Sequence, residues 1–105
     1  MKFRVIFSPE AEEDLERIFD HAFQRELDSP TGDLEIADRA LEAIRQSCAM
    51  LAINPFCYRK VGEGVFVREL VVPFGATGFV AMFEIQNAET VRIGSIRHQR
   101  ESDYH

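Results

Sequence analysis

The sequence has little positive charge. Lysine occurs only as Lys2 and Lys60, and twelve Lys and Arg residues stand against eighteen Asp and Glu residues, which gives a net charge of −6. Proteins that hold nucleic acids mainly through phosphates need a surplus of Lys and Arg, because each neutralised phosphate releases counterions. The charge balance therefore argues against binding that depends on phosphate contacts.

Long apolar runs and metal-type cysteine patterns are also missing. No run of about 18 apolar residues occurs, which excludes a membrane-spanning helix, and residues 1–7 are too short for a signal peptide. Cys48 and Cys57 have no metal-binding spacing with any histidine. Cys48 falls on an apolar helical seam, which predicts a buried thiol. We expect one domain over residues 1–105, located in the cytoplasm, with no metal and no cofactor.

A first helix is predicted after Ser8. This serine can accept a hydrogen bond from the first helical turn, and Pro9 suits the first helical position. The helix is expected to run to about Leu27. Its apolar stripe consists of Ala11, Leu15, Ile18, Phe19, Ala22 and Phe23.

A second helix is predicted to start at Ser29-Pro30 or at Asp33. It is expected to end before Asn54-Pro55, because the residue before a proline avoids the helical region. The short linker makes the two helices an antiparallel hairpin. The seam that packs them together consists of Leu34, Ala37, Leu41, Ile44, Cys48 and Leu51.

The remaining apolar segments alternate as strands do. The predicted strands are residues 2–7, Val65–Val72, Phe79–Ile85 and Thr90–His98. Residues 56–64 are predicted to form a loop, and Pro73 is predicted to end the second strand or to place it at an edge. The order β-α-α-β-β-β indicates an α+β fold, with the helical hairpin packed on one face of a small antiparallel sheet. The expected core contains Leu15, Ile18, Phe19, Leu41, Ile44, Leu51, Leu70, Val80, Met82 and Ile93.

A dense polar cluster follows the last strand. It consists of Arg97, His98, Gln99, Arg100, Glu101, Asp103 and Tyr104. A rigid strand that ends in ionisable groups is suited to hold a site, although the same residues also fit a solvated tail. Strand alternation puts His98 on the face of Arg92 and Ile96. Arg68, in the middle of an apolar strand, is either a functional cation or the partner of Glu69, Glu84 or a tail carboxylate.

The chain resembles the RelE/ParE superfamily of type II toxins. FRVIFSPEAEEDLERIFDH resembles the first strand and helix of that family, and LAINP before a Tyr-Arg loop is similar to the end of its second helix. VRELVV, FVAMFEI and VRIGSIRH resemble its three-strand meander, and RHQRESDYH resembles a ParE-type ending. The resemblance spans almost the whole chain and lies in the order and spacing of these segments.

The resemblance implies a toxin that is neutralised by a cognate antitoxin and that binds no specific DNA sequence without it. ParE-like members act on DNA gyrase, whereas RelE-like members bind the ribosome and cut messenger RNA. The RelE-like ribonucleases are strongly basic, so the acidic charge of this chain favours a ParE-like gyrase inhibitor. A ribosome-dependent mRNA endonuclease is the alternative, and a homologue with a lost or different activity is the third possibility.

Site residues follow from this resemblance and from the residue types. The candidates for target binding are Arg68, Arg92, Arg97, His98, Arg100 and Tyr104. If the chain is a ribonuclease, which needs a base, an acid and a cation, the catalytic candidates are Arg97, His98, Arg100, Glu101 and Tyr104. Aromatic side chains dominate interface hot spots. The antitoxin-binding candidates are Leu15, Phe19, Phe23, Tyr58 and Phe66.

Overall fold

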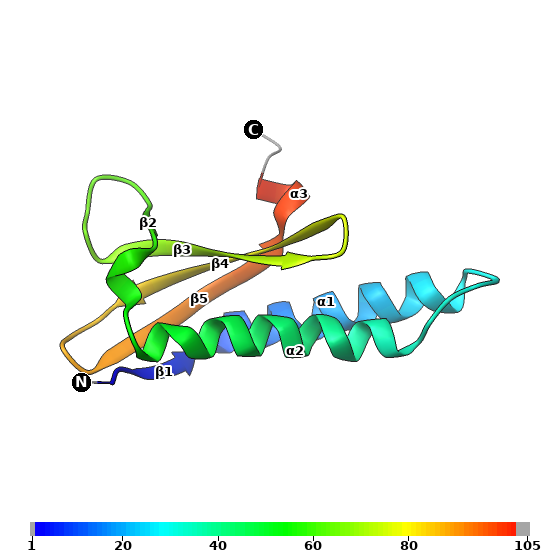
Figure 1. Ribbon diagram of the computed structural model, residues 1–105, viewed down its shortest axis with the longest axis horizontal. Helices are drawn as coiled ribbons and strands as arrows, with labels where there is room; N and C mark the ends of the chain where they lie inside the picture. The colour runs from blue at the N-terminus through cyan, green and yellow to red at the C-terminus, as the bar shows by residue number, and fades with distance from the viewer. Residues whose placement is uncertain (1, 103–105) are drawn as a thin grey trace.

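The computed structural model describes residues 2–102, in which two long antiparallel helices cover one face of a five-stranded sheet (Figure 1). The main elements are β1 (Arg4–Phe7), α1 (Pro9–Leu27), α2 (Glu35–Ala49), β3 (Val67–Phe74), β4 (Thr77–Ile85) and β5 (Thr90–His98). The short ones are η1 (Met50–Ala52), η2 (Pro55–Cys57), β2 (Arg59–Lys60) and α3 (Gln99–Ser102). The predicted α+β class and the order of the main elements are confirmed.

The strand order in the sheet is β1-β5-β4-β3-β2. Strands β3, β4 and β5 form the predicted antiparallel meander. At one edge β1 pairs in parallel with β5, and at the other β2 pairs antiparallel with β3. Neither edge was predicted, because β2 has only two residues inside the expected loop and the pairing of β1 joins distant parts of the chain. The short α3 lies on the side of the sheet away from the hairpin (Figure 1).

Strand β3 corrects two predicted boundaries. It starts at Val67 rather than Val65, and it continues through Pro73 to Phe74 instead of ending at Val72. Because β2 pairs only with Arg68 and Glu69, no strand among residues 2–102 pairs with the outer edge of β3 at Pro73, and an unpaired edge is where proline is tolerated. A tight turn follows, in which Gly75 has a φ of 60°.

The start of α1 is fastened to β5. The Ser8 hydroxyl accepts from the backbone N–H of Ala11 at 3.0 Å and donates to the carbonyl of Gly94 at 3.2 Å. The backbone N–H of Ser8 donates to the carbonyl of Ile93 at 2.9 Å. Further along α1, the Asp14 carboxylate accepts from the backbone N–H of Ile96 at 2.9 Å. Helix α1 therefore satisfies the edge of β5 beyond the point where β1 ends.

Strand β5 contains a β-bulge at this point. Ile93 pairs with Phe83 and Ser95 pairs with Met82, so that Gly94 has no partner in β4. An extra residue shifts the alternation of side chains by one position. Ile93 before the bulge and Ile96 after it are consequently both buried in the core beneath the hairpin.

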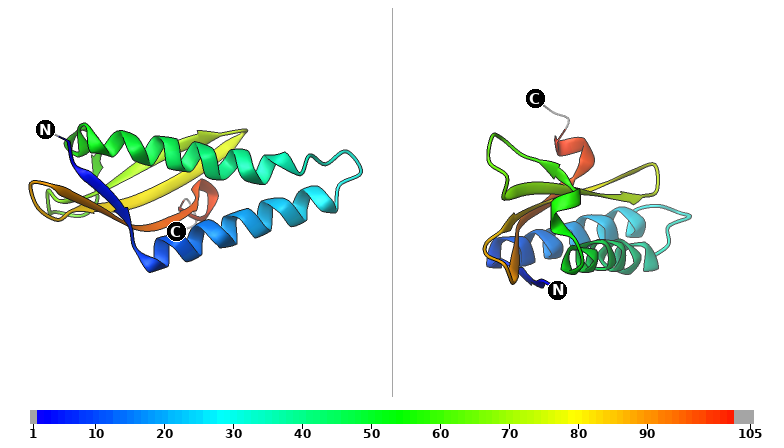
Figure 2. Two further views of the ribbon diagram at one scale, coloured as in Figure 1. Left: turned by 90° about the horizontal axis from the view of Figure 1, so that it is seen from below. Right: turned by 60° about the vertical axis from the view of Figure 1, so that its left-hand side comes forward.

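The core lies between the sheet and the helical hairpin. The predicted core residues found buried there are Leu15, Ile18, Ile44, Leu51, Leu70 and Ile93, whereas Val80 is buried outside this cluster, on the other face of β4. Phe19, Leu41 and Met82 are only half-buried, and Leu34, predicted in the helix seam, is 44% exposed. Leu34 is exposed because the free end of the hairpin reaches beyond the sheet (Figures 1 and 2), in a molecule measuring 48 × 30 × 22 Å. Met82 lies on the face of β4 opposite to that of the core residues Ala81 and Phe83. Asp33, whose carboxylate accepts from the backbone N–H of Glu35 at 3.0 Å, marks the start of α2.

The link between Asp14 and Ile96 predicts a stability effect. Ile96 is fully buried. Asp14→Ala removes the carboxylate that accepts from the backbone N–H of Ile96. Leaving this buried N–H without a partner should lower the free energy of unfolding by about 1–3 kcal/mol. Glu13→Ala is the control, since this neighbouring carboxylate is exposed and its loss changes the charge equally. Urea denaturation measures both free energies of unfolding. Equal values for the two variants would contradict the role given to Asp14.

The two thiols should differ in reactivity. Burial raises the pKa of the Cys48 thiol to about 12, whereas Cys57 is exposed. Because the thiolate is the reactive form, the native protein should show one fast thiol towards a disulfide reagent, and the second only after unfolding in guanidinium. Cys57→Ser should remove the fast reaction. Two fast thiols in the native wild-type protein would be inconsistent with this packing.

Candidate functional site

A groove lies between the two long helices. It has a volume of about 410 Å³ and is lined by Glu12, Leu15, Glu16, Phe19, Asp20, Leu41 and Arg45. Leu15 is almost completely buried, and Phe19 and Leu41 are half-buried. Leu15 belongs to the core and Leu41 is packed against it, so the apolar floor of the groove continues into the core.

The charges of the groove are uneven. Glu12, Glu16 and Asp20 are exposed and follow one another at helical spacing, so they form an acidic wall along α1. The facing helix α2 contributes one cation, Arg45, whose guanidinium lies 5.8 Å from the centre of the Phe7 ring. An apolar floor with an acidic wall suits an amphipathic segment that carries basic residues beside its apolar ones.

The predicted antitoxin-binding residues fall into separate places. Leu15 and Phe19 line the groove, and Phe23 stacks on Phe19 with ring centres 5.7 Å apart. Tyr58 instead packs edge-on against Phe83 at 6.0 Å, and desolvation raises the pKa of its hydroxyl. Phe66 is 54% exposed in the segment that precedes β3. Five of the residues that line the groove were missed as site candidates, although their spacing of four residues puts each set on one helix face: Glu12, Glu16 and Asp20 on α1, and Leu41 and Arg45 on α2.

His98 is tied into the fold by both ring nitrogens. Its Nε2 lies 3.0 Å from the Thr77 hydroxyl, and its Nδ1 accepts from the backbone N–H of Arg100 at 3.3 Å. The ring also contacts Phe79 edge-on, with centres 5.6 Å apart. Nδ1 therefore carries the lone pair and Nε2 the hydrogen, and His98 joins the end of β5 to the β3–β4 turn and to α3.

The predicted C-terminal cluster does not come together as one site. Because of the bulge at Gly94, His98 shares the inner face of the sheet with Ile96 but not with Arg92, which corrects the predicted alternation. Arg97 is adjacent in the strand and so lies on the opposite face from His98. Arg100 is exposed on α3, and Arg92 lies 4.0 Å from Glu10. Tyr104 and the side chain of Glu101 lie outside the described part of the chain.

Arg68 has a different partner from any that was predicted. Its guanidinium donates to the backbone carbonyls of Phe56 and Tyr58 at 2.8 Å and of Val65 at 2.9 Å, rather than to a carboxylate. Glu69, one of its predicted partners, pairs with Arg59. The sequence could not predict these partners, because every residue type has a backbone carbonyl and the residue types therefore do not identify which carbonyls accept. Arg68 thus joins two loop segments.

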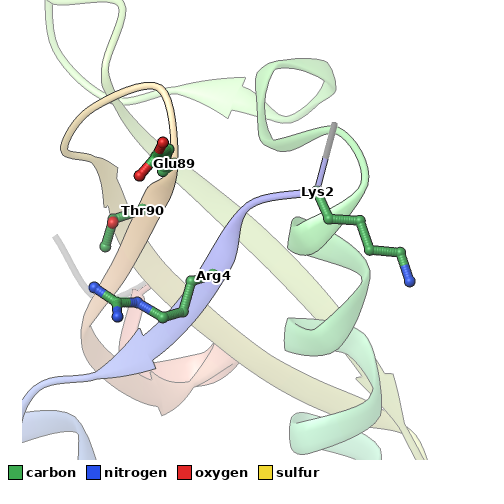
Figure 3. Close-up of a pocket in the computed structure, with 4 residues that line it drawn as sticks. All are labelled: Lys2, Arg4, Glu89 and Thr90. Carbon is green, nitrogen blue, oxygen red and sulfur yellow. The ribbon is translucent and has the colours of Figure 1, made fainter.

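A second hollow, of about 360 Å³, lies beside β1 and is lined by Lys2, Arg4, Glu89 and Thr90. Its two cations do not converge, since Lys2 and Arg4 leave the chain on opposite sides (Figure 3). Between residues 2 and 102 no cluster of three His, Cys, Asp or Glu residues is arranged to hold a metal ion. The groove on the hairpin is therefore the better-formed candidate for binding.

The sequence of residues 5–103 matches the family described as "ParE toxin of type II toxin-antitoxin system, parDE". This chain belongs to the ParE toxin family. The fold agrees, because a chain of the solved "Chromosomal ParDE TA system from P. aeruginosa" superposes with a TM-score of 0.72 at 20% sequence identity, covering 92% of this chain and 96% of that chain. No curated protein is significantly similar to it in sequence.

Membership of the ParE family implies a cognate ParD antitoxin as the partner of this toxin. The predicted toxin of a type II toxin–antitoxin system is thereby confirmed. None of the helices in the described range 2–102 has the length and apolar character needed to cross a bilayer.

Proposed function

We propose that this ParE toxin inhibits DNA gyrase through protein–protein contacts, and that its antitoxin blocks it by laying a helix in the groove between α1 and α2. The gyrase target is what the ParE branch of the superfamily implies. The main support for the proposal is that both ring nitrogens of His98 lie at hydrogen-bond distance from groups of the fold itself. It bears directly on the alternative, an RNA-cleaving toxin.

A ribonuclease of this kind must move protons at the 2′-hydroxyl and at the leaving oxygen. The lone pair of His98 is used by the backbone of Arg100, and its N–H faces Thr77. The nearest strand cation, Arg97, lies on the other face of the sheet. The net charge of −6 also opposes docking on ribosomal RNA. These features together support a toxin that acts by binding a protein.

The groove supports the second half of the proposal. An antitoxin helix with apolar residues at a spacing of three and four would cover Phe19 and Leu41, and its flanking Lys or Arg residues would face Glu12 and Glu16. A partner that binds the folded toxin but not the unfolded chain stabilises the folded toxin. The complex should therefore melt at a higher temperature than the free toxin.

The acidic wall predicts how charge controls antitoxin binding. Glu16→Lys should slow association with the purified ParD antitoxin several-fold at low salt and weaken its salt dependence, because rim charges act mainly on the association rate. Glu13→Lys is the matched control, since it makes the same charge change on the same helix outside the groove. Stopped-flow or surface plasmon resonance measures both rates. If the two variants slow association equally, the wall has no specific role.

The two activities are separated by His98→Ala. If the toxin inhibits gyrase, purified wild-type protein should abolish supercoiling while mRNA on translating ribosomes stays intact, and the variant should inhibit nearly as well because no proton has to move. A ribonuclease would instead lose about 10²–10⁴-fold in cleavage on losing a general acid or base. Both proteins are compared in a supercoiling assay and in a ribosome-dependent cleavage assay.

The antitoxin complex provides the control, since it should suppress whichever activity is found. Thermal melting of His98→Ala guards against misfolding, because the substitution removes contacts to Thr77 and Phe79. The gyrase proposal would be overturned by three results together. Excess wild-type toxin would leave supercoiling unaffected, the wild type would cut mRNA, and His98→Ala would not cut it.

A further inference from the structure

One cation of the hairpin differs from the others in its partners. Four Arg and twelve Asp or Glu residues lie within residues 9–49, so carboxylates greatly outnumber cations on this part of the chain. Three of the four cations pair with a carboxylate: Arg17 with Asp14 at 3.2 Å, Arg25 with Glu26 at 3.4 Å, and Arg39 with Asp33 at 2.6 Å. Among the side chains described within residues 2–102, no carboxylate pairs with Arg45. Its guanidinium N–H groups are therefore open to a partner molecule.

Arg45 lies on the wall that α2 contributes to the groove. Its guanidinium lies 5.8 Å from the centre of the Phe7 ring, and this half-buried ring packs against the core. Stacking on an aromatic ring restricts a guanidinium while its N–H groups stay available at the rim. A side chain that is restricted in advance loses less entropy when it binds. Arg45 is thus positioned to bind a carboxylate that enters the groove.

The wall formed by α1 has the opposite charge. Glu12, Glu16 and Asp20 line it, and the apolar floor with Phe19 and Leu41 lies between the two walls. A helix that binds with its apolar side on this floor meets anions along one flank and a cation along the other. If the same helix is turned end for end, its apolar side still faces the floor, but its two flanks exchange walls. The floor therefore allows both directions, whereas the charges favour one.

We propose that the two charged walls hold the antitoxin helix in one direction, and that Arg45 is the specificity-determining residue of the α2 wall, donating to an Asp or Glu side chain of the antitoxin. Lys or Arg residues on the other flank of the helix face Glu12 and Glu16. In the reversed direction the antitoxin carboxylate would face these two anions, and the antitoxin cations would face Arg45. This inference rests on the groove that the proposed function assigns to the antitoxin, and it does not depend on the gyrase target.

The charge pattern also restricts which antitoxins fit. A segment with basic residues on both flanks would match the α1 wall but would be repelled by Arg45. A segment with acidic residues on both flanks would be repelled along α1. Once the helix covers Arg45, the hydrogen bond to its carboxylate is shielded from water, where charge-assisted hydrogen bonds are stronger than on an open surface. The groove therefore selects a helix with one basic and one acidic flank.

The test is a set of double-mutant cycles between the purified toxin and ParD, with Kd measured by surface plasmon resonance. Arg45→Gln removes the cation from the toxin, and each Asp or Glu of ParD is changed in turn to Asn or Gln. Arg45→Gln should raise the Kd about tenfold, as expected for the loss of a charge-assisted hydrogen bond. One ParD carboxylate should couple to Arg45, so that its substitution raises the Kd for the wild type but adds little for Arg45→Gln.

A second set of cycles tests the direction of the helix. Glu16→Gln is combined with the substitution of each Lys or Arg of ParD, and one of these cations should couple to Glu16. The cation that couples to Glu16 and the carboxylate that couples to Arg45 should lie on opposite flanks of one ParD helix. Arg45→Glu should weaken binding further than Arg45→Gln, and a Lys in place of the coupled ParD carboxylate should restore part of the affinity.

Gln46→Glu is the matched control. It lowers the net charge by the same amount as Arg45→Gln, on the next residue of α2, at an exposed position outside the groove. It should leave the Kd for ParD nearly unchanged. Thermal melting of the free toxins checks for a merely structural role, since Arg45→Gln also loses the contact with Phe7. Arg45→Lys keeps the charge without the planar fork and should retain part of the affinity.

Three results would overturn the inference. Arg45→Gln and Arg45→Glu could both bind ParD as tightly as the wild type, even if they melt at a lower temperature. No ParD carboxylate could couple to Arg45, or the coupled carboxylate and the coupled cation could lie on the same flank. Failure of the groove assignment is detected separately, because binding would then be unaffected by Glu16→Lys as well as by the Arg45 variants. An effect of Glu16→Lys without any effect of Arg45 would keep the groove and remove only the role of Arg45.

Discussion

The architecture depends on how the exposed edge of β5 is completed. Strand β1 covers this edge only as far as Ile93, where the bulge begins. From there, Ser8 and Asp14 take over with hydrogen bonds to Gly94 and Ile96. A buried strand edge with unpaired backbone groups would be unstable, so the position of α1 and the continuation of β5 depend on each other. The hairpin, its groove and the end of β5 are all placed by this junction.

The same junction decides the orientation of the C-terminal residues. A one-residue bulge turns every later side chain of β5 to the other face. His98 is thereby brought under Phe79 and beside Thr77, where it serves the fold, while Arg97 is turned to the face without the hairpin. A strand without the bulge would put His98 with Arg92 on the open face. The chemistry available at the end of the chain thus follows from the bulge at Gly94.

The parts of the fold that could be predicted are those with local signals. Ser8 and Pro9 mark the start of α1, and the alternation of β5 identifies the whole strand, because capping and period depend on near neighbours. The glycine within β5 was a signal for the bulge that alternation alone does not use. The parallel pairing of β1 and the backbone partners of Arg68 join distant segments, so no local pattern predicts them. For the same reason the sequence grouped Leu15 with Phe66, which the fold separates.

The open edge of β3 has a further consequence for a toxin that acts only when released from its antitoxin. An unpaired strand offers its backbone to other chains and can start aggregation. Here the outer strand β2 is two residues long, and the uncovered part of β3 contains Pro73, which has no N–H to give. A neighbouring chain therefore meets few backbone groups with which it could pair as an added strand at this side of the sheet. At the β3 side of the sheet, the free protein therefore offers little template for self-association through β-strands.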